Sequence, residues 1–108
     1  MKIVYCKHLP FRGYLCMMLC GLLIVRKEYK SCLNERIINH ERIHFEQQKE
    51  MLFLGFFLWY VLEWIVRFLL YFDAKKAYRN LLFEKEARKH EGDLEYIKNR
   101  EPFNFMDL

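Results

Sequence analysis

Five consecutive residues, His40-Glu41-Arg42-Ile43-His44, form a complete H-E-x-x-H motif. On a helix, residues i and i+4 lie on one face with Cβ atoms roughly 6 Å apart, so both imidazoles can bind one Zn²⁺. Glu41 lies about 100° further round the helix, where its carboxylate can take a proton from an attacking water instead of binding the metal. The motif therefore predicts one zinc ion per chain, with His40 and His44 as ligands and Glu41 as the general base of a hydrolase.

Two histidines do not complete a catalytic zinc site, which usually has three protein ligands and a water. The extended motif H-E-x-x-H-x-x-G-x-x-H is excluded, because Gln47 and Glu50 occupy its glycine and final histidine positions. The segment Phe83-Glu84-Lys85-Glu86-Ala87 resembles instead the gluzincin pattern, in which a glutamate of an E-x-x-A motif on a later helix binds the metal. The resemblance implies Glu84 as the third ligand and leaves Glu86 as the alternative.

The order of motifs over most of the chain is also similar to a group of small bacterial proteins of metallopeptidase type. That group combines a G-x-L-x-x-R-K-like strand, N-H-E-x-I-H-x-x-Q, an aromatic-rich helix and A-Y-x-N-x-x-F-E-x-E-A. The corresponding segments here are Gly21 to Lys27, Asn39 to Gln47 and Ala77 to Ala87. The resemblance implies a zincin-like core and a gluzincin-like metallopeptidase that cleaves a peptide or protein substrate, but it does not identify that substrate.

Polar residues near the motifs are candidates to orient the histidines or to stabilise an oxyanion. In many gluzincins an acidic residue after the glutamate ligand orients a histidine, but this chain has Arg88 at that position. Other residues must then take over this role. The candidates on the same two segments are Asn39, Gln47, Tyr78, Arg79, Asn80 and His90.

Three helices are expected to position these side chains, over residues 34–54, 56–72 and 74–91. Ser31 or Asn34 can cap the first helix. A continuous helix through residue 72 would end about 40 Å from His44, at 1.5 Å per residue. We therefore expect the chain to reverse at Gly55, the only glycine in this run. The reversal would return Glu84 to within one helical turn of the height of His44.

The N-terminal 28 residues predict a β-hairpin. Two β-prone runs, Lys2 to Cys6 and Gly21 to Val25, are separated by turn residues between Pro10 and Gly13. A signal anchor over the apolar run Tyr14 to Val25 is the alternative. Together with a loosely packed tail at 92–108, these elements predict a single domain, 1–108, of the α+β class and mainly α.

Composition restricts the partners of the chain. The net charge is +4, without a basic stripe that interleaves with aromatic residues, so nucleic-acid binding is not expected. The four cysteines form no C-x-x-C pair, which argues against a thiolate zinc site and favours reduced thiols in a cytoplasmic protein. Aromatic residues make up 18% of the chain, so self-association is also expected.

A second hypothesis is a non-enzymatic, membrane-associated small protein with a structural or vestigial zinc site. Between Met51 and Phe72 only Glu63 and Arg67 are charged, and the run is long enough to cross a bilayer or to lie on its surface. The cluster Lys75, Lys76 and Arg79 follows directly and would suit anionic headgroups.

Overall fold

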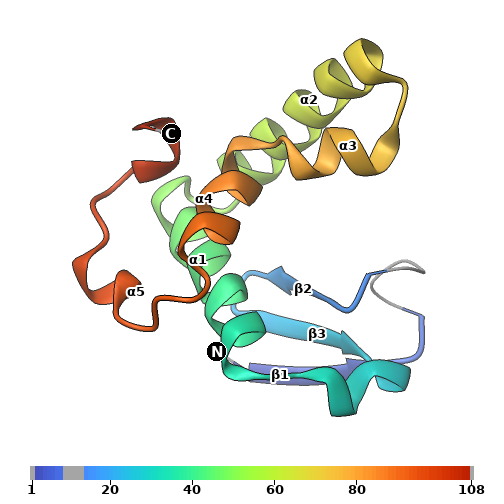
Figure 1. Ribbon diagram of the computed structural model, residues 1–108, viewed down its shortest axis with the longest axis vertical. Coiled ribbons are helices and arrows are strands. Elements are labelled where there is room, and N and C mark those ends of the chain that lie inside the picture. Colours follow the sequence, from blue (N-terminus) through green and yellow to red (C-terminus); the bar gives the residue numbers. More distant parts are fainter. Residues whose placement is uncertain (1, 9–13, 108) are drawn as a thin grey trace.

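A computed structural model describes residues 2–8 and 14–107 of the chain. Within this part the fold is α+β and mainly α, as predicted, with a small sheet at one end and several helices beside and above it (Figure 1).

The sheet has three strands, β1 (Lys2–Cys6), β2 (Cys16–Leu19) and β3 (Leu22–Arg26), in the order β1-β3-β2. β2 and β3 are antiparallel and form a tight hairpin, whereas β1 and β3 are parallel. The sequence prediction of a hairpin between Lys2–Cys6 and Gly21–Val25 is therefore wrong, and β2 was missed. The turn expected between residues 10 and 13 lies outside the described residues.

The physical reason for this error is the turn between β2 and β3. It consists of Cys20 and Gly21, whose φ angles are +50° and +93°. Positive φ at both central residues is what a type I′ turn, a common two-residue hairpin turn, requires, and glycine adopts it without steric cost. The apolar run from residue 14 to 25 thus contains two strands and their turn, instead of one strand.

Helix α1 (Glu35–Glu50) follows a 3₁₀ helix, η1 (Lys27–Cys32). The Asn34 side chain caps α1, because its Oδ1 accepts a hydrogen bond of 2.9 Å from the N–H of Ile37. The chain reverses at Leu52 and Phe53, which have φ angles of +56° and +59°, and not at Gly55, which lies inside α2 (Leu54–Tyr71). The predicted position of the reversal was wrong, because two residues without a glycine's freedom adopt the left-handed backbone here.

The single helix predicted over 74–91 is divided into α3 (Ala74–Arg79) and α4 (Leu82–His90). Leu81, in the break, is extended with ψ 140° and is fully buried. Glu63 of α2 accepts hydrogen bonds from the N–H of Leu82, at 3.1 and 3.2 Å, and so caps α4. A carboxylate at the N-terminus of a helix is stabilising, which explains why α4 starts anew at this residue.

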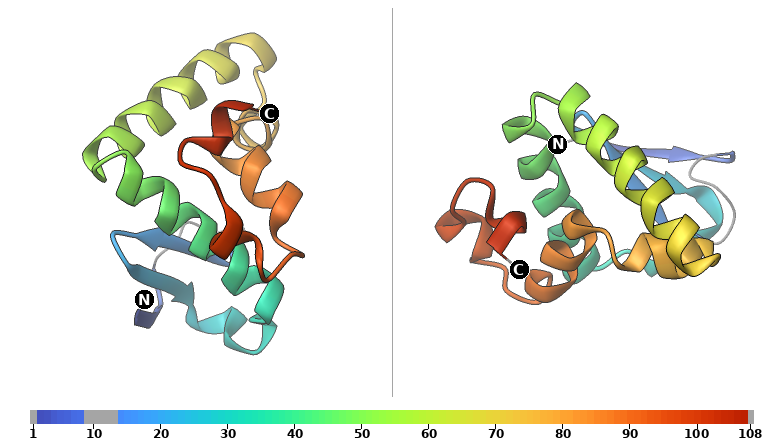
Figure 2. Two further views of the ribbon diagram at one scale, coloured as in Figure 1. Left: turned by 90° about the vertical axis from the view of Figure 1, so that its left-hand side faces the viewer. Right: turned by 90° about the horizontal axis from the view of Figure 1, so that it is seen from above.

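The C-terminal segment, with α5 (Tyr96–Asn99) and η2 (Asn104–Asp107), lies against α4 and α1 (Figure 2). It is not the loosely packed tail that the sequence suggested. Phe105 is fully buried and its ring centroid lies 4.5 Å from that of Phe83. Only 5% of the Arg100 side chain is exposed, because it is bonded to Glu50 and Glu86.

Candidate metal centre

Three side chains from two adjacent helices meet at one point, His40 and His44 of α1 and Glu84 of α4. The two histidine Nε2 atoms are 3.2 Å apart. The carboxylate oxygens of Glu84 lie 2.9 Å from His44 Nε2 and 3.2 Å from His40 Nε2. Two nitrogens bound to one tetrahedral zinc at ~2.0 to 2.1 Å lie roughly 3.3 Å apart, so this geometry suits a shared ion.

The chemistry of these atoms also suits a cation. Glu84 Oε2 is buried and makes no hydrogen bond of good geometry to the described residues, although His40 Nε2 lies 3.2 Å from it. A buried carboxylate oxygen without such a bond is rare and needs an explanation such as an ion. Two imidazoles and a carboxylate are one of the standard ligand sets of catalytic zinc, which keeps a fourth position for water. The residues present therefore fit zinc.

The outer nitrogen of each histidine is held by a second residue. His44 Nδ1 lies 2.8 Å from Gln47 Oε1, and His40 Nδ1 lies 2.6 Å from Glu91 Oε2. Such partners keep the proton on Nδ1, so that Nε2 faces the metal. Gln47 was a sequence candidate for this role, and the structure places its side chain beside His44.

Glu91 was missed by the sequence analysis. It is the residue directly after α4, seven positions beyond Glu84, and hence two turns further along the same side of the helix. The acid that orients a histidine was sought at position 88 by analogy with gluzincins. Arg88 instead lies with its Nε 4.0 Å from Glu84 Oε2. The spacing of seven residues between Glu84 and Glu91, two helical turns, was the signal that could have pointed to Glu91.

Glu86, the alternative ligand, faces another set of partners and does not join the histidines. Its carboxylate accepts hydrogen bonds from Gln47 Nε2 at 2.9 Å and from the Tyr96 hydroxyl at 2.6 Å. Arg100 donates from both Nε and Nη2. The pKa of Glu86 is below its usual value, since these donors outweigh the burial that would raise it.

Glu41 is buried in the same cavity as His44 and Glu84. Burial raises its pKa, although the charges of the two histidines oppose this shift. The thiol of Cys16 on β2 lies 3.5 Å from Glu41 Oε1 and donates to it. Cys16 stays protonated because burial and the neighbouring Glu41 raise its pKa. This cysteine was not a sequence candidate, because its strand was not predicted.

His44 and Glu84 form a charged pair when no metal neutralises them. Burial lowers the pKa of His44, but the adjacent Glu84 carboxylate outweighs burial and raises it to about 9. Burial in turn raises the pKa of Glu84, and the positive charge of His44 lowers it well below its usual range. Zinc binding must therefore displace a proton from His44 at neutral pH.

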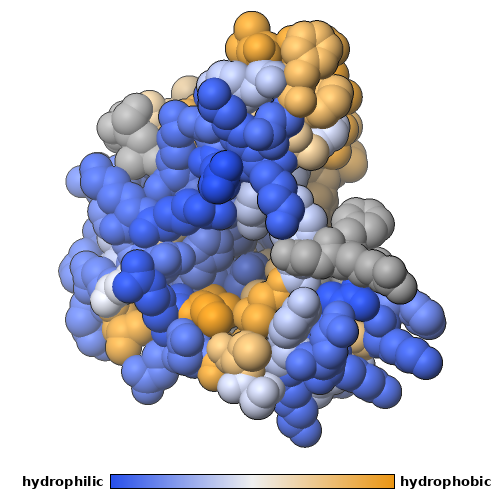
Figure 3. All heavy atoms as spheres, turned by 45° about the vertical axis from the view of Figure 1, so that its right-hand side comes forward, coloured by the Kyte–Doolittle hydropathy of each residue, from blue (hydrophilic) through white to orange (hydrophobic). Residues whose placement is uncertain are grey.

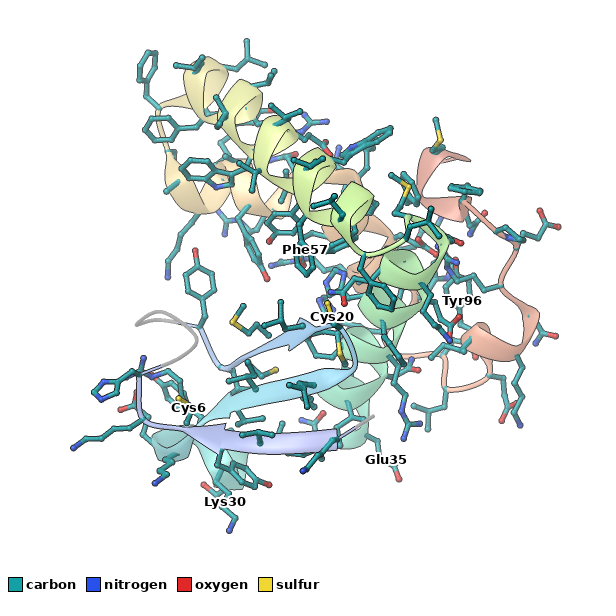
Figure 4. The ribbon with its side chains drawn as sticks, turned by 180° about the vertical axis from the view of Figure 1, so that it is seen from behind. Cys6, Cys20, Lys30, Glu35, Phe57 and Tyr96 are labelled. Carbon is teal, nitrogen blue, oxygen red and sulfur yellow. The ribbon has the colours of Figure 1, made fainter. Side chains whose placement is uncertain are left out.

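A cavity of about 400 Å³ opens beside Glu41, His44 and Glu84 between β2 and α2. Phe57 reaches from α2 toward the sheet across this space (Figure 4). A second cavity of about 240 Å³ lies on the side of His40 and Glu91. Most of the remaining lining of the larger cavity is aromatic or contains methionine, namely Tyr14, Met17, Met18, Phe56, Tyr60, Trp64 and Tyr78.

Of the other residues predicted to orient a histidine or to stabilise an oxyanion, Tyr78 alone lines a cavity. Tyr78 lines both cavities, and burial raises its pKa, so its hydroxyl is a proton donor. Asn39 Nδ2 instead donates to backbone carbonyls after α4, including that of Glu91 at 2.9 Å. Arg79 is exposed, Asn80 bonds the end of α3, and His90 stacks on Tyr96. Of these four, none lines either cavity.

Comparison with known proteins adds no identification. No protein-family model matches the chain, and neither a curated protein nor a solved structure is significantly similar to it.

Proposed function

We propose that this chain is a zinc-dependent metallopeptidase, with His40, His44 and Glu84 as the ligands of one zinc ion. The observation that carries the proposal is the convergence of three ligand atoms, all within 4.8 Å of one another, next to the buried carboxylate of Glu41. A structural zinc site would need no general base in an adjoining cavity. The combination of ligands, base and open space is that of a hydrolytic centre.

Zinc would polarise the scissile carbonyl and lower the pKa of the attacking water. Glu41 would accept the proton of that water and deliver it to the leaving amine, a role that its raised pKa favours. Cys16 donates to one oxygen of Glu41 and leaves the other for this transfer. Tyr78, a protonated donor in the same cavity, would stabilise the negative charge on the carbonyl oxygen.

The lining of the cavity predicts the kind of side chain that lies next to the scissile bond. Phe56, Tyr60 and Trp64 of α2 face Met17 and Met18 of β2 across the space. Such walls favour a large apolar or aromatic side chain and exclude water from the reacting groups. We therefore propose peptides with a bulky apolar residue at the cleavage site as the substrate class.

The strand β2 offers a way to align an extended peptide. It has β3 on one side, and among the described strands nothing pairs with its other edge. Gln48 already bonds the carbonyl of Met18 and the N–H of Cys20, so an added strand would run beside the start of β2, near Cys16. Cys16, at the start of β2, contacts Glu41. A peptide that paired with this part of β2 would therefore lie next to the catalytic base.

The test is the cleavage of a mixed peptide library by zinc-loaded wild type and by Glu41→Gln. We expect the wild type to cleave beside bulky apolar residues, and the variant to retain zinc but to lose activity by a factor of about 10² to 10⁴. The Tyr60→Ala variant should relax the preference for aromatic residues. Equal activity in wild type and Glu41→Gln would overturn the mechanism. Zinc binding without any cleavage would mean a structural zinc site.

A further inference from the structure

The outer face of α2 is entirely aliphatic. The structure describes α2 throughout, and its exposed residues are Leu54, Leu58, Val61, Leu62, Ile65, Val66, Leu69 and Leu70. Their exposed fractions reach 69% at Leu54 and 68% at Leu70. At 100° per residue these positions form one broad stripe along the helix. A contiguous apolar surface of this kind marks a place where something else binds.

The polar residues of α2 lie on the opposite face, toward the protein. Glu63 accepts from Trp59, Arg67 and the N–H of Leu82, and is only partly exposed. The inner face also contributes Phe56 and Trp59 to the core. By length and composition the helix could cross a membrane. Only 6% of its residues are buried within the protein, so it is not a core helix.

The next helix, α3, argues against a membrane-crossing α2. α3 returns alongside α2, and Trp64 Nε1 donates to the carbonyl of Ala74 at 3.3 Å. α3 exposes Lys75, Lys76 and Arg79. If α2 crossed a bilayer, these cations would be drawn into the hydrocarbon with it, at a cost of several kcal/mol each. A helix that lies along the surface avoids this cost.

We propose that α2 binds along the surface of an anionic lipid bilayer, with its aliphatic face among the acyl chains. Figure 3 shows hydrophobic surface gathered at the α2 end of the molecule, next to the hydrophilic surface of α3. The cations of α3 would then contact lipid phosphates beside the inserted face. This placement does not depend on the proposed peptidase activity.

Charge favours a bilayer over a second copy of the chain as the occupant. The net charge is +4, and Lys75 and Lys76, which follow α2 closely in the chain, are exposed, with their Nζ atoms 5.7 Å from the Tyr14 ring and 4.5 Å from the Tyr71 ring. Anionic headgroups complement these cations. Two copies joined through their α2 helices would instead bring a net positive charge on each side together, which disfavours association.

The test is flotation of the purified full chain with vesicles of phosphatidylcholine, with and without phosphatidylglycerol. We expect binding to the anionic vesicles and little binding to the neutral ones. The double variant Leu62→Glu with Val66→Glu should lose binding by at least a hundredfold. Lys75→Glu should weaken it about fivefold or more. Leu94→Glu changes an apolar side chain that is 51% exposed outside α2, and it should bind as the wild type does.

Circular dichroism would verify that each variant is folded. Absence of flotation with folded wild type would overturn the proposal. So would a dimer in light scattering that the double variant dissociates, because a second copy would then cover the face. Cleavage of the segments before and after α2 by protease on opposite sides of sealed vesicles would also overturn it, in favour of a membrane-spanning helix.

Discussion

Two buried glutamates of α4, Glu84 and Glu86, stand two residues apart and have opposite environments. Glu86 is fully buried and receives hydrogen bonds from Gln47, Tyr96 and Arg100. Glu84 is 3% exposed, faces two histidines, and has one oxygen without a hydrogen bond of good geometry to the described residues. The same residue type thus lies in a closed polar network on one side of α4 and in a centre that suits a cation on the other.

These environments indicate that Glu86 has a structural role. A buried charge with every acceptor filled stabilises the packing of its own partners, here α1, α4 and the C-terminal segment. Glu84 instead faces the two histidine nitrogens, at 2.9 and 3.2 Å, and a cation can bind all three groups. Gln47 joins the two regions, because its oxygen holds His44 and its nitrogen holds Glu86.

The largest expected effect is the loss of stability in Glu86→Ala. The variant leaves Arg100, whose side chain is 5% exposed, with Glu50 as its remaining ion-pair partner. Removal of one member of a buried ion pair typically costs about 3 to 5 kcal/mol. Urea unfolding of the zinc-free protein measures this loss. Above pH 9, where His44 has released its proton, Glu84→Ala should cost clearly less. An equal cost there would remove the contrast between the two residues.

Zinc should stabilise variants of Glu86 but not variants of Glu84. At a free zinc concentration about a thousand times the dissociation constant, binding adds about 4 kcal/mol to the free energy of unfolding. We expect this gain in the wild type and in Glu86→Gln, and no gain in Glu84→Gln. Unfolding curves with and without zinc provide the measurement. A zinc-dependent gain in Glu84→Gln would identify another ligand.

The stability of the zinc-free protein should fall as the solution becomes more alkaline. The pKa of His44 is raised from 6.5 to about 9, chiefly by Glu84 against the effect of burial. The proton on His44 therefore stabilises the folded state fully below pH 6.5, and its contribution of roughly 3 kcal/mol is lost as the pH rises through about 9.

Unfolding at a series of pH values tests this dependence, and nuclear magnetic resonance titration of His44 tests its origin. Glu84→Gln should lower the pKa of His44 and flatten the pH dependence, while Glu86→Gln should leave both unchanged. A normal pKa of His44 in the wild type would show that Glu84 does not form the pair described above.

The smallest of these effects concerns Gln47, the residue shared by the two regions. Gln47→Leu removes the acceptor that orients His44 and should weaken zinc binding by about 10- to 100-fold. Gln48→Leu is the matched control, because Gln48 is equally buried but bonds β2. Competition with a metal-binding dye measures both affinities. Equal affinities for the two variants would mean that Gln47 does not support the metal centre.

Local geometry explains what could be predicted from the sequence. The spacing of His40 and His44 and the cap at Asn34 depend on one helix alone, and both agree with the structure. The position of Glu84 required the resemblance to gluzincins together with an argument about helix lengths. The mainly helical α+β class also followed from composition and periodicity.

What escaped prediction depends on contacts between distant segments. The parallel pairing of β1 with β3 and the burial of Arg100 join residues far apart in the chain. Leu52 and Phe53 adopt positive φ without any glycine signal, so the reversal was misplaced. Such features follow from packing and cannot be inferred from local patterns.

The central claim is that Glu84, and not Glu86, completes a zinc site with His40 and His44. The most direct measurement is the zinc content per folded chain, by plasma mass spectrometry after dialysis, of wild type, His44→Ala, Glu84→Gln and Glu86→Gln. We expect about one zinc per chain in the wild type and in Glu86→Gln, and almost none in the other two variants. A wild type without zinc, or a Glu84→Gln variant that retains it, would contradict the account.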